Sequence, residues 1–192
     1  MAFESDGGAP QAYLNADARG GSAGGKDSFT VAEAGNQIIR GEPGWSGMLG
    51  MPATVSYAFR SSAPSTMPED TSGFSRFNSA QIAQAELALA GWSDVARISF
   101  VRVGTGSFGE AAYSDQATIL FSNYSAGNDD ATAFAYFPGS TASSSRAGDV
   151  WVNITLGTNS TPALGNYGAM VLVHEIGHTI GLDHPADYDA DG

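Results

Sequence analysis

Apolar residues recur every three or four positions between residues 78 and 96, which predicts a helix with one buried face. The segment opens with Asn78, and Gln81 follows three residues later, so the two residues can form a capping box. We expect the apolar face of this helix to pack in the core. Its repeating apolar positions are Ile82, Ala85, Leu89, Trp92 and Ala96.

Shorter runs that alternate between apolar and polar residues predict strands. Gly, Pro and Ser cluster between these runs, as is typical of turns and loops. The predicted strands are residues 54–59, 98–103, 117–121, 133–137 and 149–153. Upstream, Thr30 and Glu33 have the spacing of a capping box, which predicts a short helix that ends near Arg40 and Gly41. Helices and strands therefore mix in one α/β (α+β) domain.

The first 27 residues contain three Gly-Gly pairs and few large apolar side chains. Such a segment cannot bury enough apolar surface to offset the entropy lost on ordering. We expect residues 1–27 to form a flexible leader and residues 28–192 to form the folded domain. With 42% hydrophobic residues, the chain is long enough for one core.

The apolar pattern near the C-terminal end predicts a helix over residues 169–181. His174 and His178 are four residues apart in this helix, so their side chains share one face. Gly181 stands where a left-handed residue can end the helix. The turn that follows can bring His184 back toward the same face.

Two imidazoles at this spacing can hold one metal ion, and His184 can add a third ligand. Because the chain contains no cysteine, metal ligands must be nitrogen or oxygen atoms. Three histidines leave an open position on tetrahedral zinc, where a water becomes a nucleophile near neutral pH. Glu175 can then act as the general base in peptide-bond hydrolysis. Two other interpretations are histidines that hold no metal and a zinc ion with a purely structural role.

Acidic residues outnumber basic residues by 20 to 8, which gives a formal net charge of -12. This charge repels phosphate backbones and anionic lipid surfaces, so we expect neither nucleic acid nor membrane as a partner. No run of about 18 apolar residues occurs, and the N-terminal residues lack the basic and apolar regions of a secretory signal.

Together with the motif at residues 174–184, several other segments make the chain resemble the serralysin family of metzincins, which are secreted bacterial zinc endopeptidases. The resemblance covers roughly residues 28–192. The further segments that carry it are His184-Pro185 with Asp187-Tyr188, residues 148–153, residues 133–139, residues 87–89 and residues 92–96. A metzincin of another branch, matrixin-like or astacin-like, is an alternative that these flanking segments disfavour.

The resemblance implies a zincin-like metalloprotease domain, with a twisted mixed sheet, an antiparallel edge strand and two long helices, one of which carries the zinc motif. It implies zinc as the cofactor, held by His174, His178 and His184, with Glu175 as the catalytic residue. The edge strand would bind an extended substrate by main-chain pairing, through Ala133, Phe134, Ala135, Tyr136 and Phe137. For the three aromatic residues, ordinary strand packing is the alternative interpretation. The family also has N-terminal pro-segments, so residues 1–27 could be one.

The chain departs from the family pattern after His184. The family has a methionine turn, followed by a tyrosine that can approach the metal, some tens of residues past its third histidine, and a β-roll beyond. In this sequence eight residues follow His184, and all five methionines precede it. We therefore expect the N-terminal part of a catalytic domain whose C-terminal subdomain is missing.

Two functions follow from this interpretation. The first is a zinc-dependent endopeptidase that acts on protein or peptide substrates in the extracellular space. The alternative is a catalytically incomplete fragment that binds zinc, needs a partner chain or the missing C-terminal segment, and acts as an interaction module. Calcium is a possible second cofactor by resemblance, without support from residues in this chain.

Overall fold

The structure of the chain, a computed structural model, describes residues 21–23, 26–28, 30–39, 44–48, 50–68, 70–127, 131–139 and 146–184. The chain divides into two compact units: residues 1–41 together with 183–192, and residues 42–182. Most of the predicted leader, and the tail with Pro185, Asp187 and Tyr188, lies outside the described residues.

The first unit contains a strand pair and a helix. β1 (Gly21–Ala23) pairs antiparallel with β2 (Lys26–Ser28), where the sequence predicts no regular structure. α1 (Val31–Ile39) begins directly after the predicted capping box. The Thr30 hydroxyl accepts the backbone N–H of Glu33 at 3.2 Å, and the Glu33 carboxylate accepts the backbone N–H of Thr30 at 2.7 Å. The short N-terminal helix is therefore confirmed.

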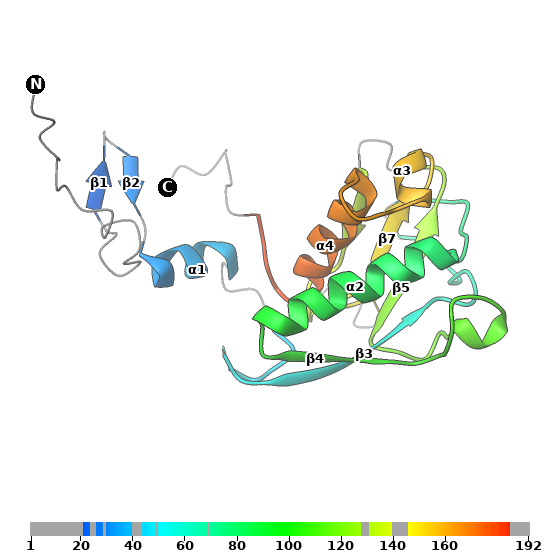
Figure 1. The fold of residues 1–192 in the computed structure, drawn as a ribbon, viewed down its shortest axis with the longest axis horizontal. Coiled ribbons are helices and arrows are strands. Elements are labelled where there is room, and N and C mark those ends of the chain that lie inside the picture. The colour runs from blue at the N-terminus through cyan, green and yellow to red at the C-terminus, as the bar shows by residue number, and fades with distance from the viewer. Residues whose placement is uncertain are drawn as a thin grey trace, which may run out of the picture. The chain divides into compact units, whose positions relative to one another are not determined.

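A five-stranded mixed sheet forms the centre of the second unit, in the order β4-β3-β5-β7-β6 (Figure 1). The first four of these strands run parallel, and β6 runs antiparallel to β7. The predicted antiparallel edge strand is thus confirmed, although it is shorter than predicted. The strands are β3 (Ala53–Phe59), β4 (Ile98–Arg102), β5 (Ile119–Tyr124), β6 (Ala133–Ala135) and β7 (Val150–Asn153).

Two long helices, α2 (Ser79–Val95) and α4 (Tyr167–Thr179), pack against one face of this sheet (Figure 1). The capping box of α2 forms as predicted: the Asn78 side chain accepts the N–H of Gln81 at 3.0 Å, and the Gln81 side chain accepts the N–H of Asn78 at 2.9 Å. Among the described residues, no helix is both long and apolar enough to cross a bilayer. Two short helical segments that the sequence does not predict are α3 (Gly157–Ser160) and the 3-10 turn η3 (Glu110–Ala112).

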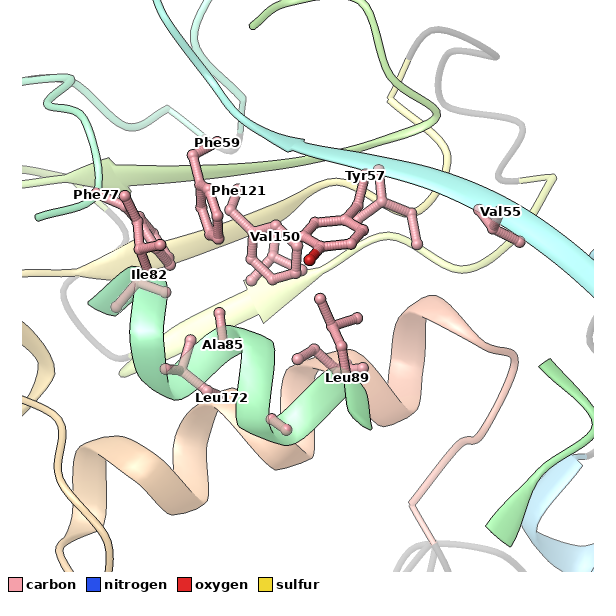
Figure 2. Close-up of a cluster of buried hydrophobic side chains, with 14 of the residues drawn as sticks. Val55, Tyr57, Phe59, Phe77, Ile82, Ala85, Leu89, Phe121, Val150 and Leu172 are labelled. Carbon is pink, nitrogen blue, oxygen red and sulfur yellow. The ribbon is translucent and has the colours of Figure 1, made fainter. Parts of the chain in front are cut away.

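The main core lies between the sheet and the two long helices. Successive side chains of a strand point to opposite faces, and this alternation turns Val55, Tyr57 and Phe59 of β3 toward the helices. Figure 2 shows these side chains with Phe121 of β5, facing Leu89 and its neighbours on α2. The rings of Phe59 and Phe121 are fully buried, with centroids 5.5 Å apart. Leu172 and Ile176 of α4 belong to the same cluster, so this aromatic core also anchors the helix that carries the histidine motif.

The opposite face of the sheet carries a smaller cluster of Tyr124, Tyr136 and Trp151. Because both faces of β5 and β7 are covered, every residue of these two strands is buried. Continuous burial is typical of central parallel strands. On α4, His174 is exposed and His178, one turn later, is half-buried.

Candidate metal centre

The helix that carries the motif, α4, begins two residues before the predicted start. Its N-cap is Asn166, whose side-chain oxygen accepts the backbone N–H of Ala169 at 3.0 Å. Such a cap satisfies one of the N–H groups that a helix N-terminus leaves without a partner. Leu172 and Ile176 are buried in the main core, whereas His174 is exposed. One face of α4 thus anchors the helix and another presents its imidazoles.

His174 and His178 meet one turn apart on α4. Their Nε2 atoms are 3.1 Å apart, and their rings are nearly perpendicular. Two histidine ligands at about 2.0–2.1 Å from one tetrahedral zinc ion would have nitrogens roughly 3.3 Å apart. The observed separation therefore suits two nitrogens that share one ion.

The turn after α4 fixes the orientation of His178. The Nδ1 atom of His178 lies 2.6 Å from the carbonyl oxygen of Leu182. A carbonyl only accepts, so Nδ1 carries the proton and Nε2 of the neutral ring keeps its lone pair. Metal-binding histidines are commonly held in this way, by a hydrogen bond from the nitrogen that does not bind the metal.

His184 follows two residues after Leu182 in the chain. One nitrogen of each of the three imidazoles lies within 4.8 Å of the other two. Among the described residues, these three form the only group of at least three His, Cys, Asp or Glu side chains spaced to hold a metal ion. The three predicted ligands are therefore brought together, and their nitrogen set suits zinc.

Glu175 follows His174 directly in α4 and is only 6% exposed. Its Oε2 atom is buried and has no hydrogen-bond partner within the described part of the chain. Burial raises the pKa of Glu175 to about 7. A buried carboxylate without a partner is unfavourable unless a nearby positive charge compensates it. The Glu175 side chain therefore also suits a site that holds a cation.

The predicted substrate strand contributes only its first three residues to β6. The ring of Phe134 packs against Tyr124 and Tyr136 in the smaller cluster, which agrees with the strand-packing interpretation for these side chains. Phe137 lies elsewhere, with its ring edge-on to His178 at a centroid distance of 5.4 Å. The aromatic residues of this segment are thus divided between the core and the metal centre.

The backbone of β6 keeps one edge turned away from the sheet. Thr132 and Tyr136 exchange hydrogen bonds with the strand beside them: the Thr132 carbonyl accepts the N–H of Asn153 at 3.1 Å, and the N–H of Tyr136 donates to Asp149 at 3.0 Å. In an antiparallel ladder, neighbouring residues alternate in direction, so the backbone groups of Ala133 point outward.

A family model described as matrixin, of the M10 peptidases, matches residues 55–190, which is more than half of the chain. The chain therefore belongs to this family of M10 peptidases. Its serralysin and AprA relatives support the serralysin-type metzincin that the sequence predicted, and not another branch. Serralysin G of Dickeya chrysanthemi is 42% identical over 182 residues, covering 90% of this chain and 36% of that protein.

Two further relatives carry protease names. Metallopeptidase AprA of Pseudomonas marginalis is 41% identical over 169 residues, with 86% of this chain and 34% of that protein covered. Metalloprotease AprA of Pseudomonas entomophila is 39% identical over 179 residues, with 91% and 35% covered. The chain therefore spans about a third of the length of the relatives that it matches.

Sequence reasoning missed a long-range contact at the C-terminal end of α4. Trp45 donates its indole N–H to the carbonyl oxygen of Thr179, the last residue of α4, at 2.7 Å. The two residues are 134 positions apart in the sequence. Neither periodicity nor motif spacing could have linked them, because both patterns are local.

Proposed function

We propose that this chain is a serralysin-type zinc endopeptidase domain, in which His174, His178 and His184 hold zinc and Glu175 is the general base. The observation that carries the proposal is the approach of three imidazole nitrogens to within 4.8 Å of one another. Glu175, the residue after His174, adds a buried carboxylate oxygen with no hydrogen-bond partner among the described residues. The resemblance to the serralysins further supports peptide bonds of proteins as the substrate and an extracellular location.

In this proposal the three histidines hold the zinc ion, and the carboxylate of Glu175 transfers the proton. When bound, zinc supplies Lewis acidity toward a water molecule and toward the peptide carbonyl. Oε2 of Glu175 accepts a proton from the attacking water and then returns it to the amine nitrogen of the leaving group. A carboxyl with a pKa of about 7 can both accept and return a proton near neutral pH.

The outer edge of β6 is the proposed substrate strand. An extended peptide would pair with the outward backbone groups of Ala133 and Ala135, while Phe134 and Tyr136 contribute packing. Phe137, at the end of the segment, contacts His178 and so connects this edge with the metal centre. Main-chain pairing requires little side-chain selectivity, which supports activity on many protein substrates.

The decisive experiment compares Glu175→Gln with the wild-type chain in zinc content and casein hydrolysis. We expect the variant to keep one zinc per chain and to lose hydrolysis by at least about a hundredfold, because the amide cannot accept the proton. Asp94→Asn is the matched control, since it removes an exposed carboxylate of α2. Hydrolysis that persists in Glu175→Gln would overturn the assigned role.

A specific observation supports the alternative function, a zinc-binding interaction module. A groove of about 700 Å³ lies between α2 and the start of α4, and its apolar side chains are unusually exposed. Leu87 is 61% exposed, Leu164 is 93% exposed and Met170 is 57% exposed. Exposed apolar surface of this kind is typical of binding sites for other protein segments. A chain that binds zinc stoichiometrically but hydrolyses no casein would favour this function.

A further inference from the structure

The C-terminal end of α4 leaves four backbone carbonyl groups that cannot find partners within the helix. Three of them have partners in the helix itself or in the turn that follows. The carbonyl of Ile176 accepts the Thr179 hydroxyl at 2.8 Å, that of Gly177 accepts the N–H of Leu182 at 3.0 Å, and that of His178 accepts the N–H of Gly181 at 3.0 Å.

The last two of these bonds form a Schellman motif. Gly181, with a φ of 97°, is the left-handed residue that this motif requires. The motif leaves the carbonyl of Thr179 without a local partner. Because Thr179 is fully buried, water cannot supply the missing hydrogen bond.

Trp45 completes the set from a distant part of the sequence. Its indole N–H donates to the Thr179 carbonyl at 2.7 Å, so all four terminal carbonyls are satisfied. The ring of Trp45 also lies over Gly148, where an added Cβ would come within 2.8 Å of the indole. Gly148 therefore leaves the space that the ring occupies while it caps the helix.

The capped turn is the same turn that holds His178. Its imidazole donates from Nδ1 to the carbonyl of Leu182, whose own N–H completes the Schellman motif. Movement of the turn would therefore change the orientation of the imidazole. Trp45 therefore contacts the turn that holds His178 through Thr179, and its hydrogen bond goes to that residue and not to His178 itself.

We propose that Trp45 is a positioning residue for the metal centre, which acts by capping α4 and so fixing the turn that orients His178. This inference rests on the proposed zinc site. It assigns Trp45 no contact with substrate or metal.

Trp92 provides a matched comparison on the same helix. Its indole N–H donates to the carbonyl of Val173 at 2.9 Å. Val173 lies inside α4, where its carbonyl also accepts the helical N–H of the residue four positions later. Loss of the Trp92 donor therefore leaves no backbone group without a partner, whereas loss of the Trp45 donor does.

The experiment measures the zinc dissociation constant of the full chain by competition with a chromophoric chelator, for Trp45→Phe and Trp92→Phe. Loss of a residue that hydrogen-bonds directly to a metal ligand typically costs about 10- to 100-fold in metal affinity. Trp45 bonds to the turn that holds the ligand and not to the ligand itself, so its effect should be smaller. We therefore expect Trp45→Phe to weaken zinc binding by about 5- to 10-fold, and Trp92→Phe by less than about twofold. Equal affinities of Trp45→Phe and the wild type would overturn the proposal.

Imidazole ¹H–¹⁵N correlation spectra of the metal-free chain provide a second, independent measurement. The proposal predicts that Trp45→Phe lowers the Nδ1–H tautomer of His178, and an unchanged spectrum would overturn it even if the wild type bound no zinc. Absence of zinc binding in the wild type would contradict the proposed function alone. If Trp45→Phe fails to fold, replacement of Trp45 by benzothienylalanine keeps the ring shape and removes only the N–H.

Discussion

Gly177 lies where α4 passes closest to Trp92. A Cβ at this position would be 3.2 Å from Cζ2 of Trp92, which is closer than most such contacts. The ring cannot withdraw freely, because its N–H is bound to Val173 on the same helix. The close approach explains why a glycine, a weak helix former, stands inside the motif helix.

We predict that Gly177→Ala lowers the free energy of unfolding by about 1 kcal/mol, because strain against Trp92 exceeds the gain in helix propensity. The matched control is Gly91→Ala in α2, where an added Cβ meets no atom within 4 Å. That change should raise the free energy of unfolding by up to about 1 kcal/mol. Urea denaturation without zinc measures both variants, and stabilisation by Gly177→Ala would show that the ring can move away.

At the residue scale, the sequence predicted the parts of the site that are local. His174 and His178 share a face because a helix repeats every 3.6 residues, and Gly181 was expected to allow the turn before His184. The division of roles within 133–137 was not predictable. The side to which each aromatic ring turns depends on the sheet partner and on the helix above it, which lie far away in the sequence.

At the element scale, the ends of helices depend on a few side chains. Asn78 caps α2 by accepting the N–H of Gln81, and its amide also donates to the carbonyl of Ser160 at 2.7 Å. The same residue therefore begins α2 and ties it to α3. Gln81 continues this network, because its amide donates to the side chain of Asn123 at 2.8 Å and to the carbonyl of Asn159 at 3.0 Å.

We predict that Asn78→Ala lowers the free energy of unfolding by about 1–2 kcal/mol, through loss of the cap. Asn78→Asp should cost less, because the carboxylate still accepts the N–H of Gln81 and loses only the bond to Ser160. Thermal or urea denaturation of the two variants separates these contributions. Equal losses in both variants would mean that the bond to Ser160, and not the cap, provides the stability.

Elements with strong local signals were predicted, and elements defined by tertiary contacts were not. α1 and α2 each begin at a capping box that is visible in the sequence. The start of β5 was predicted at Ala117, two residues early, because the strand begins where its partner β3 allows pairing. The turn α3 has no apolar period, and its place depends on bonds such as that from Asn159 to the carbonyl of Asn153 at 2.9 Å.

At the scale of the whole molecule, the proposed metal site predicts a linkage between zinc and stability. A ligand that binds only the folded chain stabilises it by about 2.7 kcal/mol at 100 times its dissociation constant. We therefore expect zinc to raise the thermal unfolding midpoint of the wild type by several degrees. His178→Ala should lose most of this shift, as measured by differential scanning fluorimetry. A shift that is equal in both proteins would indicate zinc binding elsewhere.

The buried pair of Arg60 and Asp149 links the fold to pH. Asp149 is 1% exposed, contacts the Arg60 guanidinium at 2.7 Å and accepts the N–H of Leu120 at 3.0 Å. Burial raises the pKa of Asp149 to about 7, against the opposing effects of Arg60 and of the Leu120 N–H. In the unfolded chain this carboxyl has its ordinary pKa of about 3.9.

The sign of the pH dependence follows from this difference. Between pH 4 and pH 7 the folded chain holds a proton that the unfolded chain has released, so the stability contributed by Asp149 is complete below about pH 4 and is lost as the pH rises to about 7. The loss is at most about 1.4 kcal/mol per pH unit. Asp149→Asn keeps the shape of the side chain and an acceptor for Leu120, but it cannot titrate.

We therefore predict that the difference in unfolding free energy between the wild type and Asp149→Asn changes between pH 5 and pH 7, in the direction of a weaker wild type at higher pH, and becomes constant above about pH 7. Urea denaturation at pH 5, 6, 7 and 8 measures this difference. A constant difference for Asp149→Asn would show that Arg60 keeps the carboxylate ionised throughout, and that burial does not control this pair.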